Sequence, residues 1–321
     1  MSINPRAVML DRLPLDRGDL DFAPIRAEVD TLVCHDATAP TAVAGRLAGF
    51  DVALVNKVPL DREALAAADR LKLVAVMATG TNNVDLDACR ELGIVVCNCR
   101  GYATPAVVQH VTALLTALAT RWQDYDAAIR RGDWQRAGTF CLLDYPIAEL
   151  AGRRLGIVGH GELGRGVARV AEALDMEVLV AERPGAGDIR PGRLSFEAVL
   201  AQADALTLHC PLTETTRHLF DADALARMPG HALLINTARG GLVDEAALAE
   251  ALRAGGIGGA GIDVFSTEPP PADHPLLADD IPNLILTPHS AWGTLEARRR
   301  LVSQLAENLR TFRVGAPIRR V

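Results

Sequence analysis

Three ionisable side chains stand shortly after apolar segments that have the character of buried strands. They are Arg239, Glu268 and His289, and the segments end at Asn236, Val264 and Leu286. In parallel α/β sheets, ligands bind outside the carboxyl ends of the strands, so we expect the three side chains to lie near one bound ligand. A single arginine after a strand more often forms a surface ion pair. The expectation of a ligand site therefore rests on the placement of all three side chains at strand ends.

The three residue types suit hydride transfer to a 2-oxo acid. Arg239 offers a planar fork of N–H donors that can bind the substrate carboxylate and polarise the oxo group. His289 can give a proton to that oxygen as hydride arrives, or remove it in the reverse direction. Glu268, hydrogen-bonded to the other ring nitrogen, orients the imidazole and favours its protonated form. These are the candidate catalytic residues.

A glycine-rich turn supplies a matching cofactor signal, because an apolar strand-like segment precedes it and a helix-like pattern follows. It carries three glycines at G-x-G-x-x-G spacing. Such glycines allow a tight turn, the close approach of a pyrophosphate and close packing of the helix. Free amides at the helix N-terminus then face the phosphates. The expected dinucleotide-binding residues of this turn are Gly159, Gly161, Glu162, Leu163 and Gly164.

Two residues after the next apolar segment bear on which dinucleotide binds. Glu182 lies about 20 residues beyond the glycines, where an acid meets the adenosine ribose hydroxyls. Its charge repels a 2′-phosphate and favours NAD, whereas Arg183 beside it could pair with the phosphate of NADP. Both cofactors stay open, with a slight preference for NAD.

Length and composition limit the class of protein. A chain of 321 residues exceeds one ordinary core, and its alternating strand-like and helix-like segments predict two α/β domains, one with a doubly wound parallel sheet. A net charge of −7 without a long basic run argues against a nucleic-acid partner. Scattered cysteines without a secretory signal suit a cytoplasmic protein. We expect no metal site, because no cluster has ligand spacing, and no membrane span, because the longest apolar stretch is short and polar-interrupted.

Two other segments carry expectations of their own. The loop 78–83 follows a strand and precedes a helix, so its free amides and hydroxyls could hold a carboxylate, although a simple tight turn has the same pattern. Segment 122–145 has little regular periodicity and carries Trp122, Trp134 and Phe140. Such an aromatic stretch suits packing on another subunit.

Taken together, these motifs resemble the D-isomer-specific 2-hydroxyacid dehydrogenase family. The matching stretches keep the family order and are Ala78–Asp85, Gly159–Gly164, Leu208–Thr213, Ile235–Gly240, Gly261–Phe265 with Glu268–Pro269, and Pro288–Trp292. Segments 98–105, 181–185 and 290–292 are most similar to bacterial glycerate dehydrogenases, also called hydroxypyruvate reductases. The resemblance implies NAD(P)-dependent hydride transfer between hydroxypyruvate or glyoxylate and D-glycerate or glycolate.

The resemblance also implies how the chain is organised. Residues 1–102 with 291–321 would form a flavodoxin-like substrate domain, and residues 103–290 the dinucleotide-binding domain. Family members are usually dimers joined through the cofactor domain and the arm after its first helix. Further cofactor contacts would come from Cys210, Pro211, Thr237 and Asp263, the last at the nicotinamide carboxamide. The substrate would meet Thr79, Gly80, Arg239 and Trp292, with Trp292 closing the pocket beside His289.

Alternatives stay open within and beyond this family. The chain departs from many relatives at Gln109, where an acid is common, and at Glu182, where aspartate is commoner. Glu268 argues against relatives that pair the histidine with glutamine, as formate dehydrogenases do. Reduction of another 2-oxo acid, of the lactate or phenyllactate type, remains an alternative. So does an NAD-sensing, corepressor-like binding protein, because such proteins keep all three catalytic residues.

Overall fold

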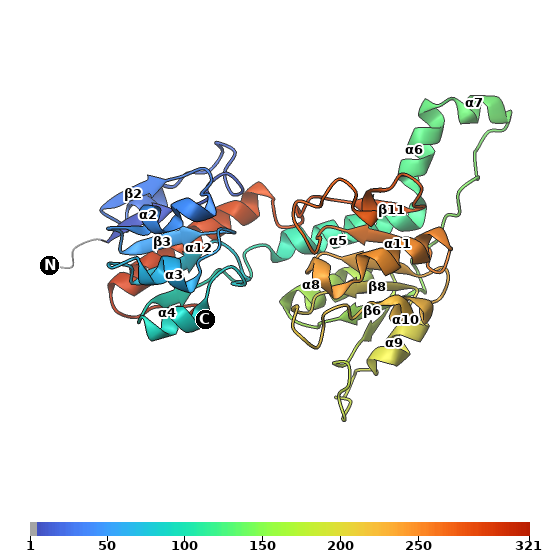
Figure 1. Cartoon of the computed structure of the whole chain (residues 1–321). Helices are drawn as coiled ribbons and strands as arrows, with labels where there is room; N and C mark the ends of the chain where they lie inside the picture. The colour runs from blue at the N-terminus through green and yellow to red at the C-terminus, as the bar shows by residue number, and fades with distance from the viewer. Residues whose placement is uncertain (1–4) are drawn as a thin grey trace. The chain divides into compact units, whose positions relative to one another are not determined.

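The computed structural model describes residues 5–321, and the chain divides into two compact units. The first unit comprises the chain up to Ala103 together with Trp292–Val321, and the second comprises Thr104–Ala291. Each unit is built on its own parallel sheet with helices around it (Figure 1). The predicted α/β class is confirmed.

The first unit contains a five-stranded parallel sheet in the order β2-β1-β3-β4-β5, which is the flavodoxin-like order. Its strands are β1 (Arg6–Met9), β2 (Thr31–Cys34), β3 (Val52–Val55), β4 (Leu73–Val76) and β5 (Val95–Cys97). Its helices are α1 (Ala23–Arg26), α2 (Val43–Leu47), α3 (Arg62–Ala66), α4 (Leu86–Glu91) and α12 (Leu295–Arg313), with the 3-10 turn η1 (Pro40–Ala42). Every residue of β3 and β4 is buried, as expected for a parallel sheet covered on both faces.

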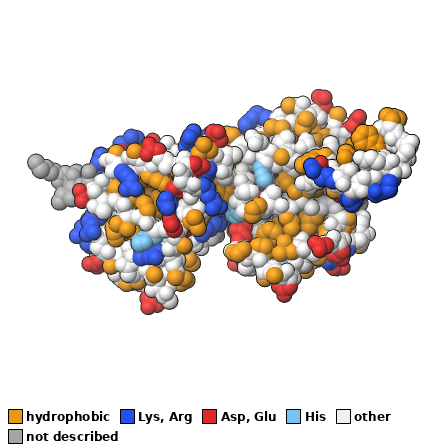
Figure 2. Space-filling model, turned by 90° about the horizontal axis from the view of Figure 1, so that it is seen from above, with side chains coloured by type: hydrophobic (Ala, Val, Ile, Leu, Met, Phe, Trp, Pro, Cys, Tyr) orange, Lys and Arg blue, Asp and Glu red, His pale blue; other side chains and the backbone are white. Residues whose placement is uncertain are grey.

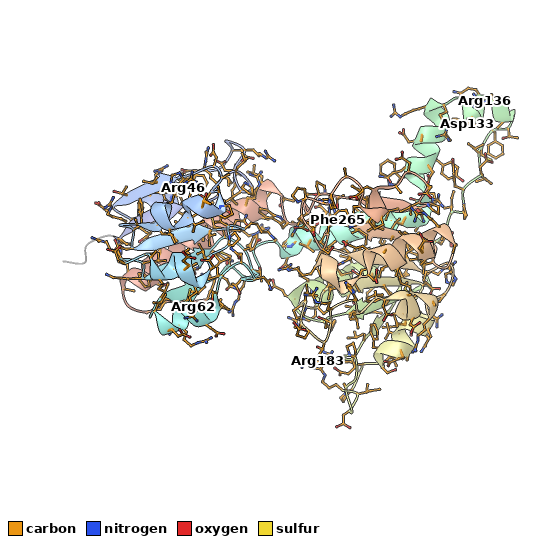
Figure 3. All side chains as sticks on the ribbon, viewed as in Figure 1. Arg46, Arg62, Asp133, Arg136, Arg183 and Phe265 are labelled. Carbon is orange, nitrogen blue, oxygen red and sulfur yellow. The ribbon has the colours of Figure 1, made fainter. Side chains whose placement is uncertain are left out.

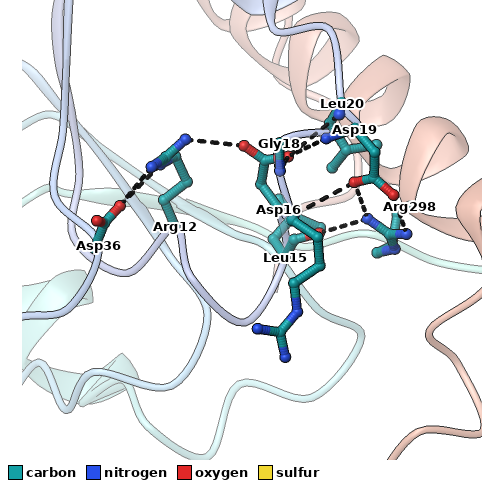
Figure 4. Close-up of polar contacts among 9 residues, drawn as sticks. Arg12, Leu15, Asp16, Gly18, Asp19, Leu20, Asp36 and Arg298 are labelled. Carbon is teal, nitrogen blue, oxygen red and sulfur yellow. Dashed lines mark hydrogen bonds and ion pairs between the residues drawn. The ribbon is translucent and has the colours of Figure 1, made fainter.

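The C-terminal helix α12 belongs to the first unit and is fixed to its N-terminal segment. Arg298 on α12 donates to both carboxylate oxygens of Asp19, at 2.7 Å each, and to the carbonyl of Leu15 at 3.1 Å (Figure 4). Further along the helix, the buried Asn308 donates from its amide to the carbonyl of Asn98. These contacts join segments that lie 210 to 283 residues apart in the chain into one folded body.

The second unit contains a six-stranded parallel sheet in the order β11-β10-β9-β8-β6-β7. Its strands are β6 (Arg154–Val158), β7 (Glu177–Val180), β8 (Ala205–Leu208), β9 (Leu233–Asn236), β10 (Gly259–Ile262) and β11 (Leu284–Leu286). Its helices are α5 (Thr104–Thr120), α6 (Trp122–Arg130), α7 (Asp133–Ala137), α8 (Glu162–Ala173), α9 (Phe196–Gln202), α10 (Ala222–Ala226) and α11 (Glu245–Arg253), with 3-10 turns η2 (Gly240–Leu242) and η3 (Pro275–Leu277). The strand order reverses between β6 and β8, which is where doubly wound sheets bind ligands.

Helices α6 and α7 form an arm that extends away from the sheet of the second unit (Figure 1). The sequence showed little periodicity there, yet both segments are helical. Two ion pairs, between the N-cap residue Arg121 and Asp124 and between Asp126 and Arg130, contribute to the stability of α6. Beyond α7 the arm exposes Phe140, which is 91% accessible, and Leu143, which is 73% accessible.

The charged side chains show no single basic face in the view that Figure 2 gives. Lys and Arg side chains are interspersed with Asp and Glu over the visible surface of each unit. Among the helices of residues 5–321, none is long and apolar enough to cross a membrane.

Candidate active site

The glycine turn of the second unit lies at the reversal point of the sheet, between β6 and α8. Gly159 has φ of 100°, and a Cβ there would lie 2.5 Å from the backbone nitrogen of Cys210, at the end of β8. A Cβ on Gly164 would lie 2.3 Å from the carbonyl oxygen of Gly159. Glycine is therefore required at both positions, because the helix and the β8 loop pack directly against the turn.

The same turn is open where a dinucleotide would approach. Among residues 5–321, apart from Gly161 and its neighbours in the chain, no atom lies within 4 Å of a Cβ built at Gly161. Gly161 is also the N-cap of α8 and supplies no side-chain cap, so the first amides of the helix keep free hydrogens for an anion. The side chain of Glu162 accepts a hydrogen bond from Thr104 Oγ1 at 2.7 Å. The turn fits a dinucleotide pyrophosphate.

Two buried polar atoms beside this turn have no hydrogen-bond partner within residues 5–321. They are Nδ1 of His209, just after β8, and Oγ1 of Thr237, just after β9. The other ring nitrogen of His209 lies 3.0 Å from Thr207 Oγ1, and burial lowers the pKa of His209 to about 4. The ring is therefore neutral at physiological pH. Unpartnered polar atoms at this edge suit a bound cofactor. Sequence reasoning named Thr237 but missed His209.

Cys210 and Pro211 follow His209 in the same loop. Burial raises the pKa of the Cys210 thiol to about 11, so the thiol is protonated and not an activated nucleophile. The carbonyl of Pro211 accepts from Thr216 Oγ1 at 2.8 Å, which closes the loop on itself. Both residues thus lie just after β8, in the segment where the family resemblance implied cofactor contacts.

Arg239 is carried by a loop that is held from both sides. The buried amide of Asn236 donates to the carbonyl of Arg239 at 2.8 Å and accepts from the backbone of Ala238 at 3.0 Å. A Cβ on Gly240 would lie 2.0 Å from the carbonyl carbon of Phe265, so this loop presses directly on the loop that leads to Glu268. Within residues 5–321, the guanidinium of Arg239 has no carboxylate partner and donates only to the Ala238 carbonyl. A surface ion pair is therefore the wrong interpretation of this arginine.

Glu268 and His289 form the pair that the sequence predicted. Glu268 Oε2 lies 2.7 Å from His289 Nδ1, and Glu268 Oε1 accepts from the backbone of Phe265 at 3.1 Å. The pairing leaves Nε2 as the ring nitrogen that faces away from the carboxylate. His289 has φ of 52°, a left-handed conformation that costs a non-glycine residue about 1 kcal/mol. The backbone amide of His289 donates to the carbonyls of Asp263 and Thr287, and these bonds fix the backbone that carries the ring.

The carboxylate of Asp263 holds the backbone of the loop that carries His289. It is completely buried, and its carboxylate accepts from Thr287 Oγ1 at 2.5 Å and from the backbone amides of Ser290 and Ala291 at 2.9 and 3.0 Å. His110 on α5 approaches the same group, with Nε2 3.0 Å from Thr287 Oγ1 and 3.7 Å from Asp263 Oδ1. Sequence reasoning missed His110, because nothing in its spacing indicates a partner 177 residues away.

The expected substrate residues of the first unit lie on two of its loops. Thr79 is exposed after β4, and its carbonyl accepts from the side-chain amide of Asn98 at 2.7 Å. Gly80 follows in the same loop, so both have backbone amides at the carboxyl end of the sheet. Trp292 packs edge-on against Tyr102, with ring centroids 6.4 Å apart. Within the described residues, no group of three or more His, Cys, Asp or Glu side chains could hold a metal ion.

A parallel sheet with a glycine turn at its reversal point, and an arginine, a glutamate and a histidine at its carboxyl edge, defines a dinucleotide-dependent oxidoreductase. Residues 112–291 match the family model described as D-isomer specific 2-hydroxyacid dehydrogenase, NAD binding domain. The chain belongs to the D-isomer specific 2-hydroxyacid dehydrogenase family. It is an NAD(P)-dependent enzyme that transfers hydride between the nicotinamide and a small 2-oxo acid, as the sequence predicted.

Relatives of known function span the whole chain. It is 47% identical to a glycerate dehydrogenase of Methylorubrum extorquens, over 97% of each chain. It is 34% identical to a hydroxypyruvate reductase of Blautia hydrogenotrophica, over 98% of each chain. Among solved structures, an NADPH-dependent glyoxylate/hydroxypyruvate reductase from Sinorhizobium meliloti, in complex with NADP and malonate, superposes with a TM-score of 0.83 at 28% identity, covering 99% of this chain and 97% of that one.

Proposed function

We propose that this enzyme reduces hydroxypyruvate and glyoxylate to D-glycerate and glycolate. The observation that carries the proposal is the 2.7 Å contact between Glu268 and His289, because it leaves one imidazole nitrogen free to exchange a proton with substrate. The similarity to a glycerate dehydrogenase at 47% identity over nearly the full chain supports the choice of substrate.

Three side chains have separate roles in the proposed reaction. Arg239, which has no carboxylate partner among the described residues, binds the substrate carboxylate and polarises the oxo group. His289 donates a proton from Nε2 to the oxo oxygen, and in the reverse direction it removes that proton. Glu268 accepts from Nδ1 and stabilises the imidazolium that precedes proton donation. The bound nicotinamide supplies or accepts the hydride.

The remaining assignments concern binding. The turn residues Gly159, Gly161, Glu162, Leu163 and Gly164 hold the pyrophosphate, while Cys210, Pro211 and Thr237 line the cofactor. Asp263 is proposed at the nicotinamide carboxamide, because its carboxylate accepts from three protein donors and only one of these bonds Oδ2, which leaves an acceptor site on that oxygen. The same carboxylate also holds the His289 loop. Three residues of the first unit are proposed to contact the substrate. Thr79 and Gly80 hold its carboxylate, and Trp292 limits the size of the substrate that can bind.

We also propose a homodimer in the cytoplasm, joined through the arm of the second unit. Phe140, Leu143 and Trp134 are exposed on or beside this arm, and large apolar side chains in one exposed segment mark a protein-binding surface. Light scattering after size exclusion tests this assembly. A dimer that becomes a monomer when Phe140→Asp and Leu143→Asp are combined supports it, whereas a wild-type monomer contradicts it.

Initial rates test the substrate proposal. Hydroxypyruvate, glyoxylate, pyruvate and phenylpyruvate are each supplied with NADH and with NADPH, and loss of reduced nicotinamide is followed by absorbance. We expect kcat/KM to be highest for hydroxypyruvate or glyoxylate. A clear preference for phenylpyruvate, or no turnover of any of the four despite NADH binding, would contradict the proposal.

A further inference from the structure

The carboxylate of Glu182 is fully occupied by donors from its own loop. Oε1 accepts from the backbone amide of Arg183 at 2.9 Å and from Nη2 of Arg190. Oε2 accepts from Nε of Arg190 at 2.6 Å and from the Arg190 backbone amide at 3.3 Å. A carboxylate has about four acceptor sites, and these four donors use all of them. The side chain is only 4% exposed.

This arrangement changes the role expected for Glu182. An acid at the end of β7 was expected to accept hydrogen bonds from the adenosine ribose hydroxyls, which requires free lone pairs. Glu182 has none free unless a bond to Arg190 or to the loop backbone breaks. Its charge is also balanced by Arg190, and these donors hold the pKa of its carboxyl well below the usual range. Glu182 therefore anchors the loop that follows β7.

The anchored loop is rich in positive charge. Segment 182–193 contains three arginines against two carboxylates. Arg183 is exposed, lies on a loop that extends from the edge of the second unit (Figure 3), and has no carboxylate partner among residues 5–321. The guanidinium of Arg190 donates two of its five N–H groups to Glu182. Its side chain is half exposed, so the other N–H groups remain available to a ligand.

The positive charge extends toward the glycine turn. Arg193 approaches Glu182 Oε1 at 3.8 Å. Burial, and then the charges of Arg193 and Arg165, lower the pKa of His160, which lies between the first two glycines. The charge of Arg193 thus acts on the glycine turn as well as on the carboxylate of Glu182.

We propose that Arg183 and Arg190 bind the 2′-phosphate of NADP(H), and that Glu182 positions Arg190 instead of binding the ribose. This inference rests on the dinucleotide site proposed above and resolves the choice that the sequence left open in favour of NADP(H). Arginine forks pair with phosphate through charge-assisted hydrogen bonds. An acid already neutralised by an arginine adds little repulsion to a neighbouring phosphate.

Two adenosine fragments isolate the 2′-phosphate from the rest of the cofactor. Adenosine 2′,5′-bisphosphate and AMP differ only in that group, and calorimetry measures the binding of each to the whole enzyme without turnover. We expect the bisphosphate to bind at least about tenfold more tightly than AMP, as one good charge-assisted pair provides. Equal affinities would overturn the inference while leaving the proposed reaction standing. Failure of both fragments and of NADH to bind would overturn the dinucleotide site itself.

Variants distinguish whether Glu182 positions Arg190 or binds the ribose, because the two roles predict opposite changes in affinity for the bisphosphate. Arg183→Ala should lose most of the gain from the 2′-phosphate and leave AMP binding unchanged. Glu182→Gln should weaken the bisphosphate as well, because Arg190 loses its anchor. If Glu182 instead bound the ribose, Glu182→Gln would weaken AMP and strengthen the bisphosphate, which contradicts the inference. Arg153→Ala, just before β6 and paired with Asp204, is the matched control and should change neither affinity.

Discussion

Glu268 Oε2 and His289 Nδ1 lie 2.7 Å apart although the two residues are separated by 21 positions in the chain. The backbone around each is fixed separately. Glu268 is held through the amide of Phe265, and His289 through the carbonyl of Asp263. The pair is therefore positioned by the ends of β10 and β11, and the imidazole orientation does not depend on substrate.

Replacing the carboxylate of this pair should slow the chemical step selectively. Glu268→Gln keeps the size of the side chain but exchanges a charge-assisted hydrogen bond for a weaker neutral one, so kcat should fall by about tenfold or more. NADPH binding, followed by nicotinamide fluorescence, should stay the same. Glu250→Gln on the exposed face of α11 is the control. A kcat equal to that of the wild type would show that the carboxylate does not assist proton transfer.

Substitution of Arg239 should impair catalysis more than substitution of an ordinary surface arginine. Arg239→Lys keeps the charge but loses the planar fork, so KM for the 2-oxo acid should rise by about tenfold or more and kcat should also fall. The exposed Arg227, directly after α10, serves as control in the variant Arg227→Lys. Steady-state kinetics with varied 2-oxo acid measure both constants. An unchanged KM would remove Arg239 from carboxylate binding.

Asp263 should contribute to stability as well as to activity. Asp263→Asn turns one acceptor into a donor that faces backbone amides, so the free energy of unfolding should fall by about 1.5–3 kcal/mol. Urea unfolding followed by circular dichroism measures the change. Because the same bonds hold the His289 loop, kcat should fall too. A variant with normal stability and normal kcat would mean that these bonds are dispensable.

His209 makes stability depend on pH between about 4 and 6.5. The pKa of His209 is lowered from 6.5 to about 4 by burial, so in this window the unfolded chain binds a proton that the native state does not. The free energy of unfolding should therefore fall as pH falls, by up to about 1.4 kcal/mol per pH unit from this group. Above pH 6.5 the contribution vanishes, because the ring is neutral in both states. His209→Gln should flatten the slope; an unaltered slope would contradict the assignment.

The sequence predicted the parts of the site that depend on local pattern. Strand character, the glycine spacing and the placement of Arg239, Glu268 and His289 after strands all follow from residues close together in the chain. The parallel sheet then brings the strand ends to one edge by geometry alone. This is why the Glu268–His289 contact could be expected from the amino-acid sequence.

The rest depends on contacts that spacing does not encode. His110 reaches Thr287 only because α5 packs against the end of the sheet, and the hydrogen bond spans 177 residues. Arg190 folds back on Glu182 because the intervening loop turns, which no periodic pattern marks. The acid that the sequence assigned to the ribose is thus occupied by its own loop. Helices α6 and α7 were not predicted because they are only nine and five residues long, too short for a periodic pattern to stand out.

The most direct test of the proposed mechanism is single-turnover reduction of hydroxypyruvate by His289→Gln with NADPH, with NADPH binding measured on the same sample. His231→Gln, at the amino-terminal end of the sheet, is the matched control. We predict that His289→Gln binds NADPH like the wild type but turns over about 10²- to 10⁴-fold more slowly, the contribution of a positioned general acid, while His231→Gln keeps its rate. A wild-type rate in His289→Gln would contradict the assignment of His289 as the proton donor.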